Sequence, residues 1–359
     1  MILEEILKGY SLPPKLGFGQ TLAPVMFRAE YRDGSWDEGE LTPYAPISID
    51  PAATVLQYAQ QAFEGLKAYK VRQSSPALFR PEMNYFRLRQ SSRRMCMPAV
   101  PRDVFARGLS EVTMALADFI PGGSGQSLYL RPFLMGTGPC LSVKSSDAFT
   151  FLVIASPSDT YFSQPIRVMV EREDCRAAVG GTGADKVGGN YAASLQATTA
   201  CIELGFDQPL WLDPRERCCI EELSGMNLVA VVDGELHTPR LSGSILPGVT
   251  RVSLLELARH QGHTVVERSI PIDELLDDIR SGRCSEFFAC GTAAIVAPIS
   301  AVGERDGSVV ELPKTGQMAA RLRSAILDIQ EGRSDDPFGW MVDAADFEAL
   351  LFRMSPGPE

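Results

Sequence analysis

The stretch Gly180-Gly-Thr-Gly-Ala-Asp-Lys-Val-Gly-Gly-Asn-Tyr191 places a lysine among five glycines. The chain has only 7 lysines against 27 arginines, so Lys186 stands out by residue type as well as by position. Glycine permits positive φ and a close approach of the backbone to a ligand. A lysine held there can lose its proton by desolvation and act as a nucleophilic amine toward an aldehyde. The alternative is a solvated loop lysine, and the rest of the sequence decides between the two.

Composition and charge exclude several classes of partner. A chain of 359 residues with 45% hydrophobic residues predicts two domains and a substantial core. The net charge of −11 disfavours binding to nucleic acids or to anionic membranes. No apolar run approaches the length of a membrane-spanning helix. The acidic N-terminal residues lack a signal-peptide pattern, so we expect a cytoplasmic protein.

The cysteines and histidines do not form a recognisable metal-binding pattern. Eight cysteines are dispersed along the chain apart from the adjacent pair Cys218-Cys219, and no Cys-x-x-Cys occurs. The three histidines are not clustered with them. We therefore expect reduced thiols and no metal site.

The hydrophobic patterning predicts a mixed α and β protein of two domains. The expected elements of the first half are strands at 25–31, 62–70, 77–80, 127–135 and 148–155, and helices at 82–96 and 103–119. The turn-rich segment 156–165 is the expected linker. The sequence thus predicts a smaller N-terminal α/β domain at 1–155 and a larger domain at 166–359.

The second half alternates helices and strands. Asn190 is expected to cap a helix from Tyr191 to Gly205, and Asp233-Gly234 predicts a type I′ hairpin turn within 226–239. The other expected strands are 209–212, 217–220, 264–270, 285–290 and 293–299, and the other expected helices are 249–260, 272–280 and 316–330.

A phosphorylated aldehyde such as pyridoxal phosphate needs four kinds of partner, and the sequence has a candidate for each. These are a lysine, an acid for the ring nitrogen, a donor for the phenolic oxygen and a cradle for the phosphate. Lys186 is the candidate amine, and Tyr191 five residues later is the candidate donor. Glu222, in Glu-Leu-Ser-Gly-Met-Asn, is the candidate acid, with Glu221 as the adjacent alternative.

Three further features are suited to hold a phosphate. Ile245-Leu-Pro-Gly-Val-Thr-Arg251 enters a helix, so the amides of Val249 and Thr250 can point at an anion. Cys290-Gly-Thr-Ala293 offers a hydroxyl and an amide beside a glycine. Arg87 adds a guanidinium fork, although three more arginines on the same expected helix make surface pairing the alternative.

The order of these segments resembles the branched-chain aminotransferases, which are class IV, fold-type-IV pyridoxal-phosphate enzymes. The matching blocks span nearly the whole chain: Tyr58 to Tyr69 (containing Phe-Glu-Gly-Leu-Lys-Ala), Phe79 to Asn84, Ser127 to Pro132, Gly180 to Tyr191, Glu222 to Leu228, Ile245 to Arg251, and Gly291 to Ala293. The resemblance implies a smaller α/β N-terminal domain and a larger pseudo-barrel domain that binds the cofactor. It also implies transamination of leucine, isoleucine and valine with 2-oxoglutarate.

The resemblance implies cofactor contacts residue by residue. Lys186 would bind the cofactor covalently and move the proton between the substrate Cα and the cofactor C4′. Glu222 would pair with the pyridine nitrogen, and Tyr191 would donate to O3′. The phosphate would be held by Arg87, the Val249 and Thr250 amides, and the Thr292 hydroxyl. The substrate carboxylate would meet the amides of Thr292 and Ala293.

The resemblance also implies the substrate pocket. Its apolar walls would be Phe18, Tyr58, Phe63, Tyr129 and Tyr161. Arg131 would bind the second carboxylate of glutamate or 2-oxoglutarate, since it lies two residues from Tyr129 and so on the same face of a strand. The alternative is a structural arginine preceding Pro132. Leu141 and Val143 would reach the neighbouring subunit's site, which implies a homodimer.

Several positions depart from the family's pattern. Val229 stands where an aromatic residue is expected after Asn-Leu, and Gln57 where a histidine precedes the pocket tyrosine. Animal relatives carry threonine in place of Gly225, and Cys-x-x-Cys in place of Ala294 and Ala297. The residues at 225 and 229 bear on pocket shape, and hence on substrate range.

The sequence argues against three kinds of alternative. A D-amino-acid aminotransferase or an aminodeoxychorismate lyase shares the lysine and the glutamate, but not Gly-Gly-Asn-Tyr after the lysine. A P-loop nucleotide-binding module needs serine or threonine after its lysine, and Val187 excludes it. A catalytically inactive binding protein of the same fold has no support, because no catalytic group is missing.

Overall fold

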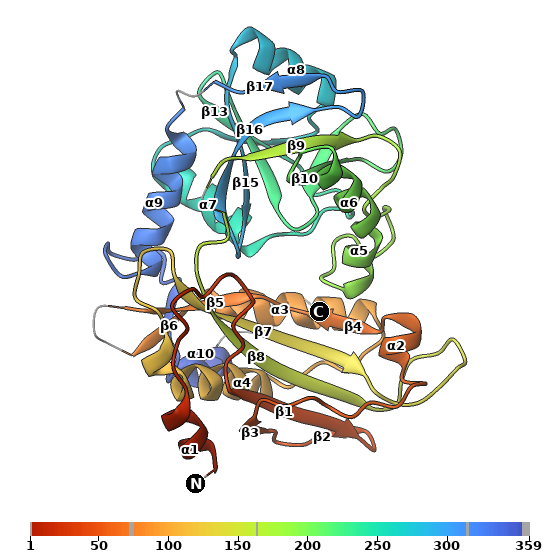
Figure 1. The fold of residues 1–359 in the computed structure, drawn as a ribbon, viewed down its shortest axis with the longest axis vertical. Coiled ribbons are helices and arrows are strands. Elements are labelled where there is room, and N and C mark those ends of the chain that lie inside the picture. Colours follow the sequence, from red (N-terminus) through yellow and green to blue (C-terminus); the bar gives the residue numbers. More distant parts are fainter. Residues whose placement is uncertain (1, 72–74, 163, 314–315, 354–359) are drawn as a thin grey trace. The chain divides into compact units, whose positions relative to one another are not determined.

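The computed structural model describes residues 2–71, 75–162, 164–313 and 316–353, so residue 163 of the expected linker lies outside the described residues. The chain forms two compact units (Figure 1). The first comprises Met1–Tyr161, Asp185–Gly188 and Leu327–Glu359, and the second comprises Phe162–Ala184 and Gly189–Ile326. The sequence assigned the whole of 166–359 to one domain. Leu327–Glu359 instead belongs to the first unit, because the C-terminal segment adds a strand and a helix to it.

The first unit is built on one sheet that is partly covered by helices. Its helices are α1 (Ile2–Gly9), α2 (Thr54–Tyr58), α3 (Pro81–Arg94), α4 (Arg102–Ala115), the 3-10 turn η1 (Ala117–Phe119) and α10 (Phe347–Arg353). Its strands are β1 (Val25–Arg32), β2 (Ser35–Trp36), β3 (Glu40–Pro43), β4 (Gln61–Phe63), β5 (Leu66–Lys70), β6 (Pro76–Phe79), β7 (Ser127–Gly136), β8 (Phe149–Ser158) and β18 (Met341–Asp343).

The sheet of the first unit runs in the order β18-β6-β5-β7-β8-β1-β2, with β3 paired to β1 and β4 to β7. Strands β7 and β8 are its centre, since they pair antiparallel from Ser127↔Ser158 to Gly136↔Phe149. Strand β8 therefore includes the first three residues of the expected linker. Helix α4 buries an apolar face against β1 and β8, and Phe105 packs its ring against Phe151 and Phe347. Figure 1 shows α10 beside α4.

The second unit is built on a sheet that closes on itself. Its strands are β9 (Ile166–Glu171), β10 (Gln208–Leu212), β11 (Ile220–Leu223), β12 (Asn227–Val232), β13 (Glu235–Pro239), β14 (Val265–Arg268), β15 (Cys284–Gly291), β16 (Ile295–Gly303) and β17 (Val309–Glu311). The helices of this part of the chain are α5 (Gly188–Ala193), α6 (Leu195–Glu203), α7 (Val249–His260), α8 (Ile272–Ser281) and α9 (Met318–Gln330).

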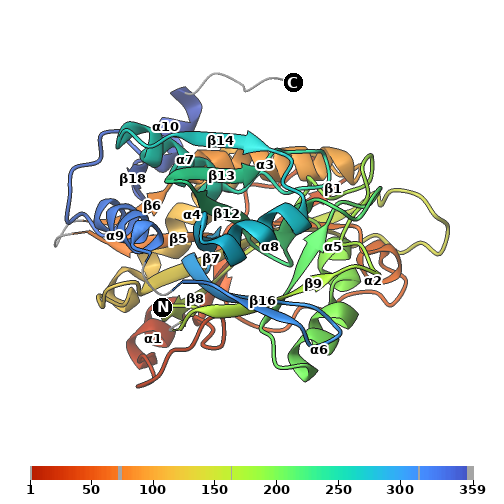
Figure 2. The same ribbon diagram turned by 90° about the horizontal axis from the view of Figure 1, so that it is seen from above.

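The second sheet follows the order β11-β10-β9-β16-β15-β12-β13-β14, and β11 also pairs with β12. That pairing closes a barrel, as the resemblance implied. The apolar side chains of its strands form one core, to which Leu275 and Ile279 of α8 contribute. Helix α8 packs on β15 and β17. It lies beside β17 in Figure 1 and is seen from above in Figure 2. Within the described residues, no helix is long and apolar enough to cross a membrane.

Several local predictions are confirmed and others need correction. The turn at Asp233-Gly234 has φ of 51° and 84°, as a type I′ hairpin requires, and α7 spans the expected 249–260. The expected strand 62–70 is interrupted between β4 and β5, and the expected helix 103–119 ends at Ala115, with η1 after it.

Two expectations in the second half were wrong in detail. The helix expected at 191–205 is divided into α5 and α6, and Asn190 lies inside α5, where its side chain bonds to Thr182 instead of capping a helix. The strand expected at 217–220 begins only at Ile220. The preceding residues form a turn in which Arg217 has φ +52° and Asp213 accepts the amides of Cys218 and Cys219.

Candidate active site

The backbone of Lys186 is held by its neighbours in the first unit. The Lys186 N–H donates to Ser91 Oγ at 2.9 Å, and its carbonyl accepts from the Phe63 amide at 3.0 Å. Val187 forms a bridge with Ala62 of β4. Helix α3 and strand β4 thus fix the direction in which the half-buried Lys186 side chain leaves the backbone. Its Nζ lies 4.5 Å from the centroid of the Phe63 ring, so the amine faces an aromatic surface.

Four of the five residues expected to line an apolar pocket are linked by contacts in the first unit. The Phe18 ring packs against Tyr129 and Tyr161, with both centroids 5.0 Å away. Phe63 joins through Arg131, whose guanidinium carbon lies 4.9 Å from the Phe63 centroid and 5.4 Å from the Tyr129 centroid. The sequence could not show these contacts, because the rings come from distant segments.

Arg131 has a hydrogen-bonding capacity that the protein does not use fully. Its Nη2 donates to the Tyr129 hydroxyl at 3.0 Å, which confirms that the two side chains share a face of β7. Its Nε is buried and has no hydrogen-bond partner among the described residues. Buried donors are nearly always paired in folded proteins, so this atom fits an absent acceptor such as a ligand carboxylate.

Tyr58, the fifth expected wall residue, makes a different contact. Its hydroxyl donates to the carbonyl of Leu141, in the loop between β7 and β8. The same loop exposes two apolar side chains, with Leu141 72% and Val143 88% accessible in the single chain. These residues therefore present an apolar loop surface next to Tyr58.

Arg87 has an internal partner that the sequence did not predict. Its Nε and Nη2 donate to the two carboxylate oxygens of Glu64, at 2.7 and 2.8 Å, and both side chains are buried. Asn84 donates to the same carboxylate at 2.7 Å. A buried carboxylate needs such compensation. The surface pairing considered for Arg87 was therefore wrong, and a contact from Arg87 to a phosphate would be additional to this ion pair.

The motif Phe63-Glu64-Gly65 has a separate function for each residue. Phe63 faces the lysine amine, and Glu64 holds Arg87. A Cβ at Gly65 would overlap the Tyr129 hydroxyl, so only glycine leaves room for that ring. One short motif thus positions an aromatic wall, an arginine and a tyrosine.

In the second unit, Glu222 of β11 is surrounded by donors. Its Oε1 pairs with Arg176 Nη2 at 2.6 Å and accepts the Leu246 amide at 3.0 Å. Its Oε2 accepts from Asn227 Nδ2 at 3.3 Å. All three of these partners are donors, which suits an ionised carboxylate. The sequence did not assign a role to Arg176 or Asn227, and no spacing signal could have shown that they meet Glu222.

Arg176 also ties the glycine-rich segment to this carboxylate. Its Nη2 lies 3.0 Å from the Gly183 carbonyl and 2.5 Å from the Ser244 carbonyl. One guanidinium therefore joins β11, the segment that leads to Lys186, and the loop that leads to α7. Such a residue fixes the orientation of Glu222.

Glu221 lies in different surroundings from its neighbour. Successive residues of a strand point to opposite faces, and the Glu221 carboxylate accepts the hydroxyls of Ser242 and Ser244, at 3.1 and 2.5 Å. Burial raises the pKa of Glu221, although the serine hydroxyls and the charge of Arg176 partly offset it. Of the two glutamates, Glu222 is thus the one with a direct cationic partner.

The N-terminus of α7 has the geometry of an anion site. Val249 and Thr250 are the first residues of this helix, so their amides have no partner within it. Gly248 precedes them, and a Cβ there would overlap the side-chain oxygen of Asn227. Asn227 Nδ2 also donates to the Leu246 carbonyl at 2.9 Å. The same asparagine thus contacts Glu222 and orders the loop that precedes α7.

Three remaining candidates lie elsewhere in the second unit. Thr292 and Ala293 form the turn between β15 and β16. Ile295, which follows, has φ +64°, a strained value for a β-branched residue and one that is concentrated at functional sites. Tyr191 lies in α5, and its ring is near Gly225, where an added Cβ would make only an ordinary contact with it at 3.9 Å.

These residues fit a pyridoxal phosphate group. The first unit supplies an amine beside an aromatic ring and an arginine with an unsatisfied buried nitrogen. The second unit supplies the Glu222 carboxylate, which accepts hydrogen bonds from several donors, and the first amides of helix α7. The groups of the first unit suit an aldehyde and a substrate carboxylate, and those of the second unit suit a pyridinium nitrogen and a phosphate.

Comparisons with known proteins agree with this chemistry. The family model described as amino-transferase class IV matches residues 61–302. The chain is 42% identical over 337 residues to branched-chain-amino-acid transaminase 1 of Bacillus subtilis (strain 168), covering 92% of this chain and 95% of the relative. It is 44% identical over 336 residues to a branched-chain-amino-acid aminotransferase of Mycolicibacterium smegmatis, covering 91% of each.

Solved structures show the same fold. A T.th. branched-chain amino acid aminotransferase complexed with N-(5'-phosphopyridoxyl)-L-glutamate has a TM-score of 0.74 and 26% identity, over 90% of this chain and 100% of that one. The branched-chain amino acid aminotransferase from Escherichia coli has a TM-score of 0.69 and 25% identity, over 89% and 99%.

Proposed function

The chain belongs to the class IV aminotransferase family, and we infer that it transfers the amino group of leucine, isoleucine and valine to 2-oxoglutarate. The products are branched-chain 2-oxo acids and L-glutamate. The protein is an enzyme, and its cofactor is pyridoxal 5′-phosphate. The observation in this chain that carries the inference is an apolar aromatic cluster that contains one arginine, Arg131, with an unsatisfied buried nitrogen.

We assign the cofactor contacts as follows. Lys186 binds the cofactor aldehyde and moves a proton to and from the substrate Cα. Glu222, oriented by Arg176 and Asn227, would hold the pyridine nitrogen and support its protonated form. When bound, pyridoxal phosphate supplies the electron-withdrawing ring that takes up charge released at that carbon. The remaining assigned contacts are Tyr191 to O3′, and Arg87, Val249, Thr250 and Thr292 to the phosphate.

The substrate contacts are inferred from the two kinds of substrate, leucine-like and acidic, whose side chains one pocket has to accept. The rings of Phe18, Phe63, Tyr129 and Tyr161, together with Tyr58, suit the apolar side chain of leucine. Glutamate brings a γ-carboxylate to the same place, and a carboxylate buried without a partner costs several kcal/mol. Arg131 at the edge of the rings supplies that partner. The amides of Thr292 and Ala293 are assigned to the substrate α-carboxylate.

The inferred substrate range is tested by amino-acid discrimination. We expect the purified holoenzyme to form glutamate from 2-oxoglutarate with L-leucine, L-isoleucine or L-valine as amino donor. D-Alanine should give no product above background. Turnover of D-alanine without turnover of L-leucine would instead favour a D-amino-acid aminotransferase.

Arg131→Met is expected to separate the two half-reactions. Of the two kinds of substrate, only the acidic ones bring a carboxylate that can pair with the arginine, so kcat/KM for glutamate and 2-oxoglutarate should fall about 100-fold, equivalent to ~3 kcal/mol. The leucine half-reaction should change much less, because an apolar side chain does not need the cation. Single-turnover rates of cofactor conversion with leucine and with glutamate measure the two effects separately.

Arg167→Met is a matched control for that substitution. Arg167 also stacks on an aromatic ring, with 5.4 Å from its guanidinium carbon to the Phe206 centroid, and its Nε is also buried without a partner among the described residues. It has no assigned substrate role, so both half-reactions should respond alike. If Arg131→Met lowered the two half-reactions in parallel, Arg131 would be a structural arginine and the assignment would be wrong.

We also propose that the enzyme is a homodimer. The exposed apolar loop residues Leu141 and Val143 support this, because they would reach the second subunit's site. Analytical ultracentrifugation should give twice the chain mass of 39.1 kDa. Replacing both residues with serine should weaken the dimer, and a wild-type mass of 39.1 kDa would contradict the proposal.

We further propose that the enzyme works in the cytoplasm. The adjacent thiols of Cys218 and Cys219, whose sulfurs lie 3.7 Å apart without a disulfide, are consistent with a reducing compartment. Activity recovered mainly from a periplasmic or secreted fraction would contradict this location.

A further inference from the structure

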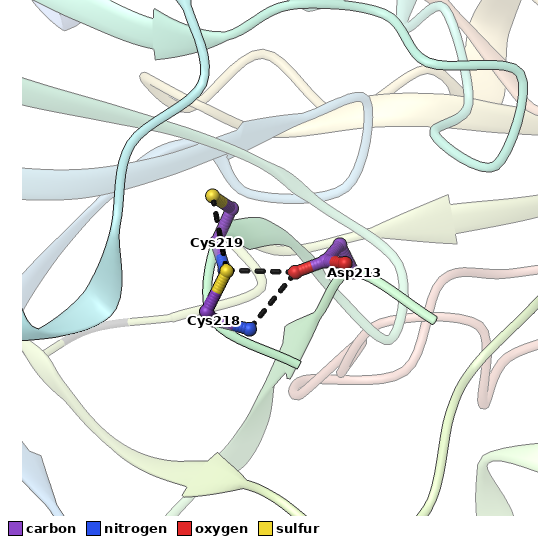
Figure 3. Close-up of side chains that lie close together, drawn as sticks. All are labelled: Asp213, Cys218 and Cys219. Atoms are coloured by element: carbon purple, nitrogen blue, oxygen red, sulfur yellow. Dashed lines mark hydrogen bonds between the residues drawn. The ribbon is translucent and has the colours of Figure 1, made fainter. Parts of the chain in front are cut away.

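The turn between β10 and β11 gathers two thiols around a carboxylate. Asp213 Oδ1 accepts the amides of Cys218 and Cys219, at 2.9 and 2.8 Å, and its Oδ2 accepts the Glu216 amide at 2.9 Å. These bonds fold residues 213–219 back on themselves. Both cysteine side chains are consequently placed beside the aspartate, as Figure 3 shows.

The distances in this turn match a shared metal ion. One ligand atom from each of Asp213, Cys218 and Cys219 lies within 4.8 Å of the others, and the two sulfurs are 3.7 Å apart. Two sulfurs that each lie about 2.3 Å from a tetrahedral zinc ion are separated by about 3.8 Å. A disulfide would require about 2.05 Å. The observed separation therefore suits a bridging ion without rearrangement of the side chains.

The chemistry of the three ligands selects the kind of ion. Thiolates favour soft or borderline cations, whereas Mg²⁺ and Ca²⁺ require oxygen ligands. We propose that Asp213, Cys218 and Cys219 form a binding site for a thiophilic divalent cation, Zn²⁺ or Cd²⁺. Three protein ligands leave one tetrahedral position, and the Glu216 carboxylate, 3.7 Å from the Cys218 sulfur, is near enough to supply it directly or through water.

The site lies outside the proposed catalytic groups but next to the strand that carries one of them. Cys219 immediately precedes β11, and Glu222 is three residues further along the chain. The sequence led us to expect no metal site, because no Cys/His spacing matched a zinc motif. The third ligand, Asp213, comes from the end of the preceding strand, so a search for cysteine and histidine patterns does not include it.

Equilibrium dialysis of the holoenzyme against Cd²⁺ tests the site. The dialysis is done under reducing, anaerobic conditions. The wild-type protein should then bind one more Cd²⁺ ion per chain than the double variant Cys218→Ser/Cys219→Ser. The double variant should bind at least about 100-fold more weakly, since loss of even an outer ligand partner costs 10–100-fold. Cd²⁺ should also raise the melting temperature of the wild type more than that of the variant.

The matched control removes two other exposed thiols. Cys96→Ser/Cys175→Ser leaves the paired thiols intact, so it should bind Cd²⁺ as the wild type does. Leucine transamination by both double variants reports that they are folded, because none of the four cysteines is assigned to catalysis. Equal Cd²⁺ binding by the wild type and Cys218→Ser/Cys219→Ser, or loss of binding in the control variant, would overturn the proposal.

Discussion

Lys186→Ala is expected to lower leucine transamination by about 1000-fold or more, because it removes both the nucleophilic amine and the group that moves the Cα proton. The fold should survive. The bonds that hold this segment, from the Lys186 N–H to Ser91 and from the Phe63 amide to the Lys186 carbonyl, use backbone atoms that alanine retains. Steady-state activity, the melting temperature and noncovalent cofactor binding would be measured together.

A second lysine, which is buried, makes this test sharper. Lys67 is 3% exposed, and its Nζ lies 5.9 Å from the Phe18 centroid, in the same aromatic cluster. Borohydride reduction of the wild-type holoenzyme should attach the cofactor to Lys186, and peptide mapping would identify the residue. Labelling of Lys67, or more than a few per cent residual activity in Lys186→Ala, would show that the wrong lysine was chosen.

Glu222→Gln is expected to reduce kcat/KM for leucine by about 100-fold or more, the size of effect seen when one charge-stabilising group is removed from an active site. The carboxylate oxygens accept from three donors, Arg176, Asn227 and the Leu246 amide. An amide would turn its own NH₂ toward one of these donors. It would also lose the negative charge that stabilises a protonated pyridine. Cofactor affinity should fall with the rate.

Glu221→Gln provides the control on the neighbouring residue. The partners of Glu221 are the hydroxyls of Ser242 and Ser244, which can donate to an amide oxygen or accept from an amide nitrogen. We therefore expect its effect on kcat/KM to stay within about tenfold, the scale of one hydrogen bond. Equal losses from the two substitutions would mean that the acid has been assigned to the wrong glutamate.

Local signals in the sequence predicted many of the elements well. The amphipathic pattern of α4 and the Leu-Pro-Gly entry to α7 depend on neighbouring residues alone, and both helices form. The turn at Asp233-Gly234 has the positive φ values that its residue types favour. The glycine-rich block around Lys186 singled out the amine that we propose as the reactive one, since few other segments combine a lysine with so many glycines.

Errors in the local predictions have long-range or side-chain causes. Asn190 does not cap a helix, because Thr182 takes both polar atoms of its side chain. Strand β11 starts late, because Asp213 draws the amides of residues 218 and 219 into a turn. The C-terminal residues join the first unit, because β18 pairs with β6. Propensity and periodicity describe one residue and its neighbours, so they do not contain these competing partners.

The sequence by itself determined the fold class, the family and the residue types of the candidate site, because these depend on short blocks whose order is visible along the chain. Only the tertiary structure decided which side chains hold the charged residues of the candidate site in place. Arg176 holds Glu222 from 46 positions away in the chain, and Glu64 holds Arg87 from 23 positions away. Burial makes each of these charges require a partner, and the packing of the strands and helices determines which partner is within reach.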